Sequence, residues 1–229
     1  NLGIKKVNTD FVFILNPDVV LEKNTIDELI KASEKIYNFA VFAPISSDPN
    51  YPNYKLSDSE ETNIKNNLPF KVKSVDGFAM LINKKNVDKI IEQENFNNEN
   101  NYFDENFFLY LENEDLCRRI VNKNEDIYII PTSKINHLGA MAVDEKYKEE
   151  IEQSRNWHWN WSKFYFRKKH YGFTTAFVSG FLIFVRSIIK SVYFLIINNK
   201  FKSKLYYCRA SGFMNATLNK RSWFRPRLD

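Results

Sequence analysis

The residues from 173 to 197 form the sequence feature that most limits how this chain can fold. The run carries only two charged side chains, Arg186 and Lys190. Spanning a bilayer takes roughly 20 apolar residues of helix, so the run is long enough to cross one. Arg186 would then lie near the middle of the membrane, at a cost of about 2.5 to 3.5 kcal/mol, which disfavours a spanning helix.

Polar side chains recur within this run close to a helical period, which leaves most of the apolar side chains on another face. These polar positions are Thr175, Ser179, Arg186, Ser187, Lys190 and Ser191. Basic residues flank the run at 167–169 and at 200–204. We therefore expect an amphipathic helix lying in a membrane interface, with a spanning helix and a buried helix of a soluble domain as the alternatives.

The net charge of the chain changes sign near residue 150. Residues 1–150 carry 18 Lys and Arg against 26 Asp and Glu, a net charge of −8, whereas residues 151–229 carry 15 against 2, a net charge of +13. An acidic part suits a metal-dependent site, and a basic, aromatic part suits an anionic membrane surface or a nucleic acid. We expect one domain over 1–150 and a basic helical tail over 151–229.

The acidic part alternates short apolar runs with helical patterns, which is typical of an α/β domain. Residues 11–15 form a continuous apolar run, as buried parallel strands do, and the turn Asn16-Pro17-Asp18 ends it. Further strands are predicted at 39–43, 78–82 and 127–130, with helices at 25–37, 84–91 and 112–122 and polar loops at 44–69 and 92–101. The two cysteines, Cys117 and Cys208, are far apart and favour a reducing compartment.

Asp18 directly follows a predicted strand, at the sheet edge where open α/β sheets bind their ligands. A divalent cation held by carboxylates stabilises the negative charge that develops on a diphosphate leaving group. Asp18 therefore suits a metal ligand. The alternative is a turn residue, because Asn-Pro-Asp favours turns by local hydrogen bonding.

A cluster of carboxylates opens the last predicted helix of this domain. Glu112 and Asp115 share one helix face and are placed to accept a proton from a hydroxyl, whereas Glu114 points largely away. The alternative is a stabilising role, because acidic residues favour the first turn of a helix. In that case Glu114 pairs with Arg118 and Asp115 with Arg119 on the surface.

His137 arrives in the loop beyond the strand that Pro131 is expected to end. A single loop histidine is usually a surface or packing residue, although imidazole is also a common metal ligand. One site would contain Asp18, the helix carboxylates and His137 if the strands that precede them in the sequence are parallel neighbours in the sheet.

Three blocks of this sequence resemble the inverting family 2 glycosyltransferases, in particular the rhamnosyltransferase-like enzymes of bacterial surface polysaccharide synthesis. The blocks lie at 1–19, 75–82 and 103–117, within a similarity that covers about residues 1–170. The resemblance implies a GT-A fold, that is a Rossmann-like mixed sheet flanked by helices. It also implies transfer of a hexose or deoxyhexose such as rhamnose from a nucleotide-diphosphate sugar to a glycan or lipid-linked acceptor. The membrane-associating tail would hold this reaction at the cytoplasmic face of the plasma membrane.

The resemblance also implies roles for single residues. Asn16 and Asp18 match the Asp-x-Asp metal motif of the family, with asparagine in place of the first carboxylate. Asp18 would then bind Mg²⁺ or Mn²⁺ together with His137. Asp76 and Gly77 match the segment that lines the sugars, so with Asn16 they are expected to contact substrate.

The proton acceptor of the family is usually the aspartate of a Glu-Asp pair, and Asn113 occupies that position here. An amide cannot usefully accept a proton, so Asn113 is expected to contact substrate instead. We favour Asp115 as the base, with Glu112 second and Glu114 third. Family members also have a first βαβ portion, so we expect the fold to be incomplete by roughly 70 to 80 residues at the N-terminus.

Two other functions are consistent with parts of the sequence. Asn113 and the expected missing portion fit a catalytically inactive, membrane-bound scaffold for glycan assembly. The basic, Trp- and Tyr-containing tail fits a nucleic-acid-binding protein. The apolar run at 173–197 argues against nucleic acid, so we expect a membrane surface as the partner.

Overall fold

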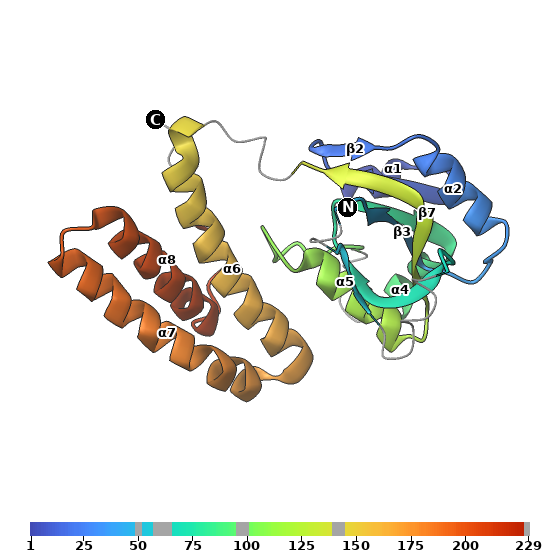
Figure 1. The fold of residues 1–229 in the computed structure, drawn as a ribbon. Coiled ribbons are helices and arrows are strands. Elements are labelled where there is room, and N and C mark those ends of the chain that lie inside the picture. Colours follow the sequence, from blue (N-terminus) through green and yellow to red (C-terminus); the bar gives the residue numbers. More distant parts are fainter. Residues whose placement is uncertain (49–51, 57–65, 95–100, 139–144, 227–229) are drawn as a thin grey trace. The chain divides into compact units, whose positions relative to one another are not determined.

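The computed structural model describes residues 1–48, 52–56, 66–94, 101–138 and 145–226, which form two compact units (Figure 1). The first unit comprises Asn1–Asp104 and Glu112–Ala142, and the second comprises Glu105–Leu111 and Val143–Asp229. The boundary between the two units falls at Val143, whereas the expected domain boundary is at about residue 150. A short segment ahead of Glu112 also belongs to the second unit.

The first unit is built on a mixed seven-stranded sheet, which confirms the predicted α/β class (Figure 1). Its strands are β1 (Phe11–Leu15), β2 (Val19–Leu21), β3 (Val41–Ser46), β4 (Tyr54–Leu56), β5 (Phe70–Val75), β6 (Ala79–Asn83) and β7 (Ile127–His137). They lie in the order β1-β6-β3-β7-β5-β4, and β2 pairs with β7 outside this path. Among the described pairs, β3 and β7 are parallel and all others are antiparallel.

Helices cover both faces of this sheet. They are α1 (Leu2–Lys6), α2 (Thr25–Ser33), α4 (Lys84–Glu94) and α5 (Glu112–Asn122). Along β6, Met80 and Ile82 pack in the core that contains α4 and α5, whereas Leu81 packs in the core that contains α2. Because both faces are buried, the strand is apolar at consecutive positions.

Strand β1 departs from the prediction made for residues 11–15. It lies at the end of the described strand order and pairs antiparallel with β6, with Phe11 opposite Asn83. Its side chains are half-buried up to Leu15, which is exposed. The predicted buried, parallel strand is therefore wrong in partner and in burial, because an apolar run indicates a strand without specifying what pairs with it.

Strand β7 runs through Pro131, where the sequence analysis expects it to end. Its pairing with β3 shifts from Ile130 to Lys134, so Pro131 lies in an irregularity of the ladder. The missing N–H of Pro131 therefore breaks no regular hydrogen bond with β3. His137 is consequently the last residue of a strand and does not lie in a loop beyond it. Strands β2, β4 and β5 were not predicted.

The start of α2 is stabilised by a contact with a distant strand. The helix begins at Thr25, but Asn24 in the left-handed conformation is its cap residue, with φ of 65°. The Thr25 hydroxyl is instead shared between the carbonyl oxygens of Glu22 and Lys134, at 2.7 and 2.6 Å. This hydroxyl therefore ties the helix to β7, and the helix ends at Ser33, earlier than expected.

The second unit is a bundle of long helices: α6 (Lys148–Tyr171), α7 (Phe173–Ile196) and α8 (Lys200–Thr217), preceded by the short turn η1 (Glu145–Tyr147). Its core is aromatic, with Trp157 fully buried and Phe213 nearly so. Two glycines permit this packing. A Cβ on Gly212 would lie 2.2 Å from the carbonyl oxygen of Trp157, and one on Gly180 would lie 2.3 Å from the Phe213 ring. The helices can therefore approach closely.

Candidate functional site

Three chain segments meet where strands of the first unit end. Strand β1 runs into the turn at 16–18, β5 and β6 are joined at 76–78, and β7 ends at His137. The backbone N–H of Asn16 donates to the carbonyl oxygen of Phe78 at 2.9 Å. Val19 of β2 pairs with His137 of β7. These contacts place the predicted metal and sugar residues side by side.

Asp18 and His137 lie in direct contact. The Oδ2 atom of Asp18 is 3.3 Å from Nε2 of His137, and the two side chains are 18% and 22% exposed. The imidazole stacks on the Phe78 ring, with 4.2 Å between centroids and an interplanar angle of 16°. The backbone N–H of Leu138 donates to the carbonyl oxygen of Asp18 at 3.0 Å. Both side chains are therefore oriented by their surroundings while they remain accessible.

This pair fits two neighbouring positions around one divalent cation. Adjacent ligands of an octahedral ion, each at about 2.1 Å, lie about 3 Å apart, close to the spacing of Asp18 and His137. Within the described ranges, no group of three or more His, Cys, Asp or Glu side chains is placed to hold an ion. Mg²⁺ usually keeps several waters and binds one or two protein ligands plus substrate phosphates. The pair is therefore suited to a cation that arrives with a diphosphate.

Asp76 adds a partly buried carboxyl group beside this pair. Burial raises the pKa of Asp76, the Glu114 carboxylate raises it further, and Lys55 and His137 lower it. Glu114 forms an ion pair with Lys55 at 2.7 Å. Lys55 is a site residue that sequence reasoning missed, because it lies in a predicted polar loop and belongs to no motif. The site thus contains the positively charged side chain of Lys55 as well as carboxylates.

Gly77 and Asn113 pack against each other at the turn between β5 and β6. A Cβ on Gly77 would lie 3.0 Å from Cβ of Asn113, so a larger residue would press on this contact. The side-chain amide of Asn113 donates to the carbonyl oxygen of Val75 at 2.8 Å. Asn113 therefore connects the start of α5 to the end of β5, and its amide has a structural partner.

Glu112 begins α5 and is half-buried. Burial raises the pKa of its carboxyl group, although its own backbone N–H lowers it. Its Oε2 atom is buried without a hydrogen-bond partner among the described atoms. Tyr110 and Leu111, which precede it, both have φ of 70°. Strained backbone of this kind is concentrated at functional sites, so the position of Glu112 suits a reactive group.

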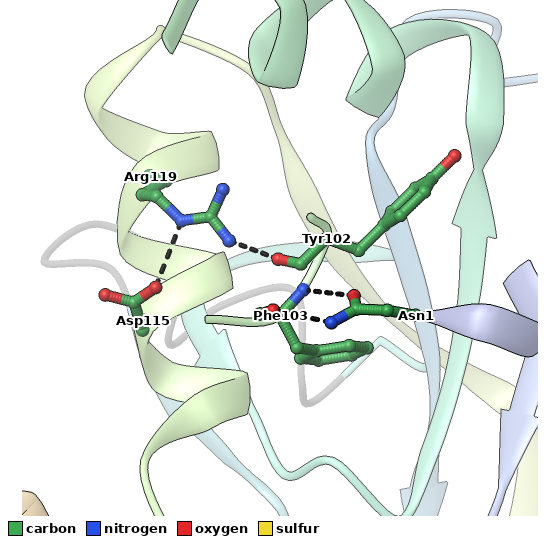
Figure 2. A network of polar contacts seen from close by, with 5 residues as sticks. All are labelled: Asn1, Tyr102, Phe103, Asp115 and Arg119. Carbon is green, nitrogen blue, oxygen red and sulfur yellow. Dashed lines mark hydrogen bonds and ion pairs between the residues drawn. The ribbon is translucent and has the colours of Figure 1, made fainter. Parts of the chain in front are cut away.

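Asp115 belongs to a network inside the first unit (Figure 2). Its side chain is fully buried, and Nε of Arg119 donates to Oδ2 at 3.1 Å. Arg119 also donates to the carbonyl oxygen of Tyr102. Next to it, the Asn1 side chain exchanges two hydrogen bonds with the backbone of Phe103, at 2.8 and 2.9 Å. The predicted Asp115–Arg119 pair forms, but it is buried and does not lie on the surface as expected, and this burial does not favour Asp115 as a base.

Helix α7 is, among the described helices, the one long and apolar enough to cross a membrane by length and composition. Only Ala176 and Ser187 are buried in it. Several of its polar side chains are bonded to neighbouring helices. Ser191 and Ser203 exchange hydrogen bonds of 2.9 Å, and Arg167 donates to Ser179 at 2.9 Å. Many large exposed side chains of α7 are apolar, including Val178, Leu182, Ile189, Val192 and Ile196, and Arg186 is exposed on the same helix.

Comparison with protein-family models and with curated proteins found no match for this chain. The resemblance to family 2 glycosyltransferases therefore depends on the three sequence blocks, and the sheet establishes an α/β fold. One fold class hosts many unrelated functions, so the function must be argued from the side chains at the site.

Proposed function

We propose that this chain binds the metal and the acceptor in an inverting glycosyl transfer that uses a nucleotide-diphosphate sugar. The observation that carries the proposal is the contact between Asp18 and His137, which come from distant parts of the sequence and meet at 3.3 Å. Ligands in α/β folds bind where strands end, which is where this pair lies. The resemblance assigns a metal role to the same two residues.

Mg²⁺ or Mn²⁺ held by Asp18 and His137 would offset the negative charge that develops on the diphosphate leaving group. Asn16, Asp76 and Gly77 would line the sugars. The acceptor hydroxyl loses its proton to a carboxylate and attacks the anomeric carbon while the bond to the diphosphate breaks. The sugar configuration inverts because one displacement takes place.

Glu112 is the carboxylate best suited to accept that proton. Asp115 is buried and bound to Arg119, and Glu114 is paired with Lys55. By contrast, burial raises the pKa of Glu112. Its Oε2 atom also has no hydrogen-bond partner among the described atoms. A base works best when its pKa is near the working pH, so a raised carboxyl pKa favours catalysis. Glu112 therefore replaces Asp115 as the proposed base.

The second unit would bind the cytoplasmic face of the plasma membrane through α7. The bonds from Arg167 to Ser179 and between Ser191 and Ser203 support a helix that keeps polar contacts within its bundle. Its exposed apolar side chains would then enter the interface. Confinement to a surface raises the local concentration of a lipid-linked acceptor, while a glycan acceptor could be reached from the same position.

Turnover by the full chain tests this proposal. Purified protein is incubated with Mn²⁺ and a panel of nucleotide-diphosphate hexoses and deoxyhexoses, and release of nucleoside diphosphate is measured with and without a membrane lipid extract as acceptor. Asp18→Ala should lower turnover about a hundredfold or more, because a bound metal supplies several kcal/mol of transition-state stabilisation. Asp27→Ala, at an exposed position of α2, is the matched control. Equal activity of the two variants would refute the metal role.

A catalytically inactive scaffold is the second candidate, and Asn113 is the observation that favours it. Its amide is engaged with Val75 at the position where the resemblance expects a base. A scaffold would bind nucleoside diphosphate in the presence of Mn²⁺ without releasing product from any donor sugar. An enzyme would show turnover that depends on Asp18, so the same assay separates the two candidates.

A further inference from the structure

A cavity of about 640 Å³ in the second unit is lined by cations. Lys146 of η1, Lys204 of α8 and Arg225 of the C-terminal segment contribute positive charge, and Glu150 is the one acidic side chain among the described lining residues. Trp223 forms an aromatic part of the wall. The excess of positive charge suits a ligand with an anionic group.

Arg225 is held in place before any ligand arrives. Its guanidinium lies 3.3 Å from the centroid of the Phe108 ring, and Nη1 donates to the carbonyl oxygens of Ser222 and Phe224 at 3.0 and 2.8 Å. The buried His158 holds the same segment, with Nε2 at 2.7 Å from the Phe224 carbonyl oxygen and Nδ1 at 2.8 Å from the Ser222 hydroxyl. A preorganised cation loses less entropy on binding than a free side chain does.

A groove of about 390 Å³ lies between α7 and α8 and is mainly apolar. Ile188 and Val192 of α7 and Met214 of α8 line it, and all three are exposed. The groove is therefore continuous with the exposed apolar side chains of α7. An apolar chain would fit this surface without burying an unpaired polar group.

The cavity and the groove adjoin. The indole N–H of Trp223, in the cavity wall, donates to Oδ1 of Asn215, in the groove wall, at 3.1 Å. Lys204 lines the cavity and Tyr207 lines the groove, and residues three apart on a helix share a face. One elongated ligand could therefore occupy both hollows.

We propose that these two hollows bind one anionic phospholipid, with its phosphate among Lys146, Lys204 and Arg225 and an acyl chain in the groove beside Val192. A free phosphate would use the cavity alone, and a zwitterionic lipid would place its own cation among the basic side chains. The site requires neither metal nor sugar donor. Loss of glycosyl transfer would therefore leave this inference standing, and failure of lipid binding would leave the proposed transfer reaction untouched.

Calorimetry on the full chain with short-chain lipids below their micelle concentration tests the inference. The probes are dihexanoyl phosphatidic acid, dihexanoyl phosphatidylcholine and inorganic phosphate. Phosphatidic acid should bind about tenfold or more tightly than either of the others, because only it offers both a charge-assisted contact and an apolar chain. Equal affinity for phosphatidic acid and inorganic phosphate would overturn the lipid assignment, and so would equal affinity for the two lipids.

Matched variants locate the site. Lys204→Gln should weaken binding of phosphatidic acid about tenfold, the value of one charge-assisted hydrogen bond. Lys202→Gln makes the same charge change on the same helix, outside the cavity, and should leave affinity within about a factor of two. Val192→Ser should weaken the lipid and leave inorganic phosphate unchanged. Equal losses in the two lysine variants would overturn the proposal in favour of diffuse attraction, and melting temperatures would verify that each variant is folded.

Discussion

The side-chain amide of Asn113 donates a hydrogen bond to the backbone carbonyl oxygen of Val75, with 2.8 Å between nitrogen and oxygen. This bond joins the first turn of α5 to the end of β5, directly ahead of Asp76 and Gly77. The resemblance places a catalytic aspartate at position 113, but an ionised aspartate has no hydrogen to donate to a carbonyl oxygen there, whereas the amide of Asn113 does. The site is therefore built around asparagine at this position.

Asn113→Asp should destabilise the first unit without increasing turnover. The new carboxylate would face the Val75 carbonyl oxygen and leave that acceptor unsatisfied, at a cost of about 1 to 3 kcal/mol. Urea unfolding measures this loss, with the exposed Asn122→Asp as the matched control at the other end of α5. A variant that transfers sugar faster than the wild-type protein would instead identify residue 113 as the position of the base.

Glu112→Gln should abolish most of the proposed transfer reaction while the protein stays folded. Loss of a general base typically lowers turnover by about 10² to 10⁴. Glu114→Gln removes a neighbouring carboxylate that is paired with Lys55 and should have a much smaller effect. Initial rates at saturating donor sugar provide the measurement. A larger loss in Glu114→Gln than in Glu112→Gln would transfer the role to Glu114.

The pH dependence of stability gives Glu112 an independent test. Its pKa is raised above 4.5 in the folded protein, so the stabilisation from its protonated form is present below the ordinary pKa and is lost as pH rises through the raised value. Above the raised pKa, the ionised, half-buried carboxylate therefore opposes folding. Glu112→Gln should be at least as stable as the wild-type protein at pH 7 in thermal melts, and its advantage should shrink at pH 4. A variant less stable at pH 7 would contradict this account.

Asp115→Asn should lower stability more than activity. The substitution removes the charge that Arg119 binds inside the first unit, at a cost of about 1 to 3 kcal/mol. Because Asp115 is fully buried, turnover per folded molecule should stay within about threefold of the wild-type value, a change of less than 1 kcal/mol. Chemical unfolding and steady-state rates on the same preparation separate the two effects. A large loss of turnover with unchanged stability would restore Asp115 as the base.

Local sequence patterns predict individual helices and strands better than they predict which strands pair with each other. Helix α5 occupies the predicted range Glu112–Asn122 because its acidic first turn and its periodic Leu116 and Ile120 agree. Strand β7 was predicted too short, because Pro131 normally ends a strand and the irregularity that accommodates it depends on β3. Pairing between distant segments is decided by the whole fold, which local sequence does not contain.

In the candidate site, too, the sequence indicates which residues take part better than it indicates how they come together. Asp18 and His137 are expected to be neighbours if the strands before them are parallel and adjacent, but they meet through the antiparallel pairing of β2 with β7. The short strand Val19–Leu21 that creates this contact was not predicted. Lys55 was also missed, because its role depends on the position of Glu114 in space. The chemical type of the side chains thus indicates the site residues, whereas their geometry follows from strand pairing that the local sequence does not contain.

The central claim is that Asp18 and His137 bind one cation together, and Mn²⁺ binding tests it most directly. Electron paramagnetic resonance of free Mn²⁺ would be titrated with the full chain, with and without a nucleoside diphosphate, for Asp18→Asn, His137→Gln and the double variant. If both side chains hold the same ion, each single variant should weaken binding and the double variant should add little further loss. Binding that is unchanged in either single variant would contradict the account.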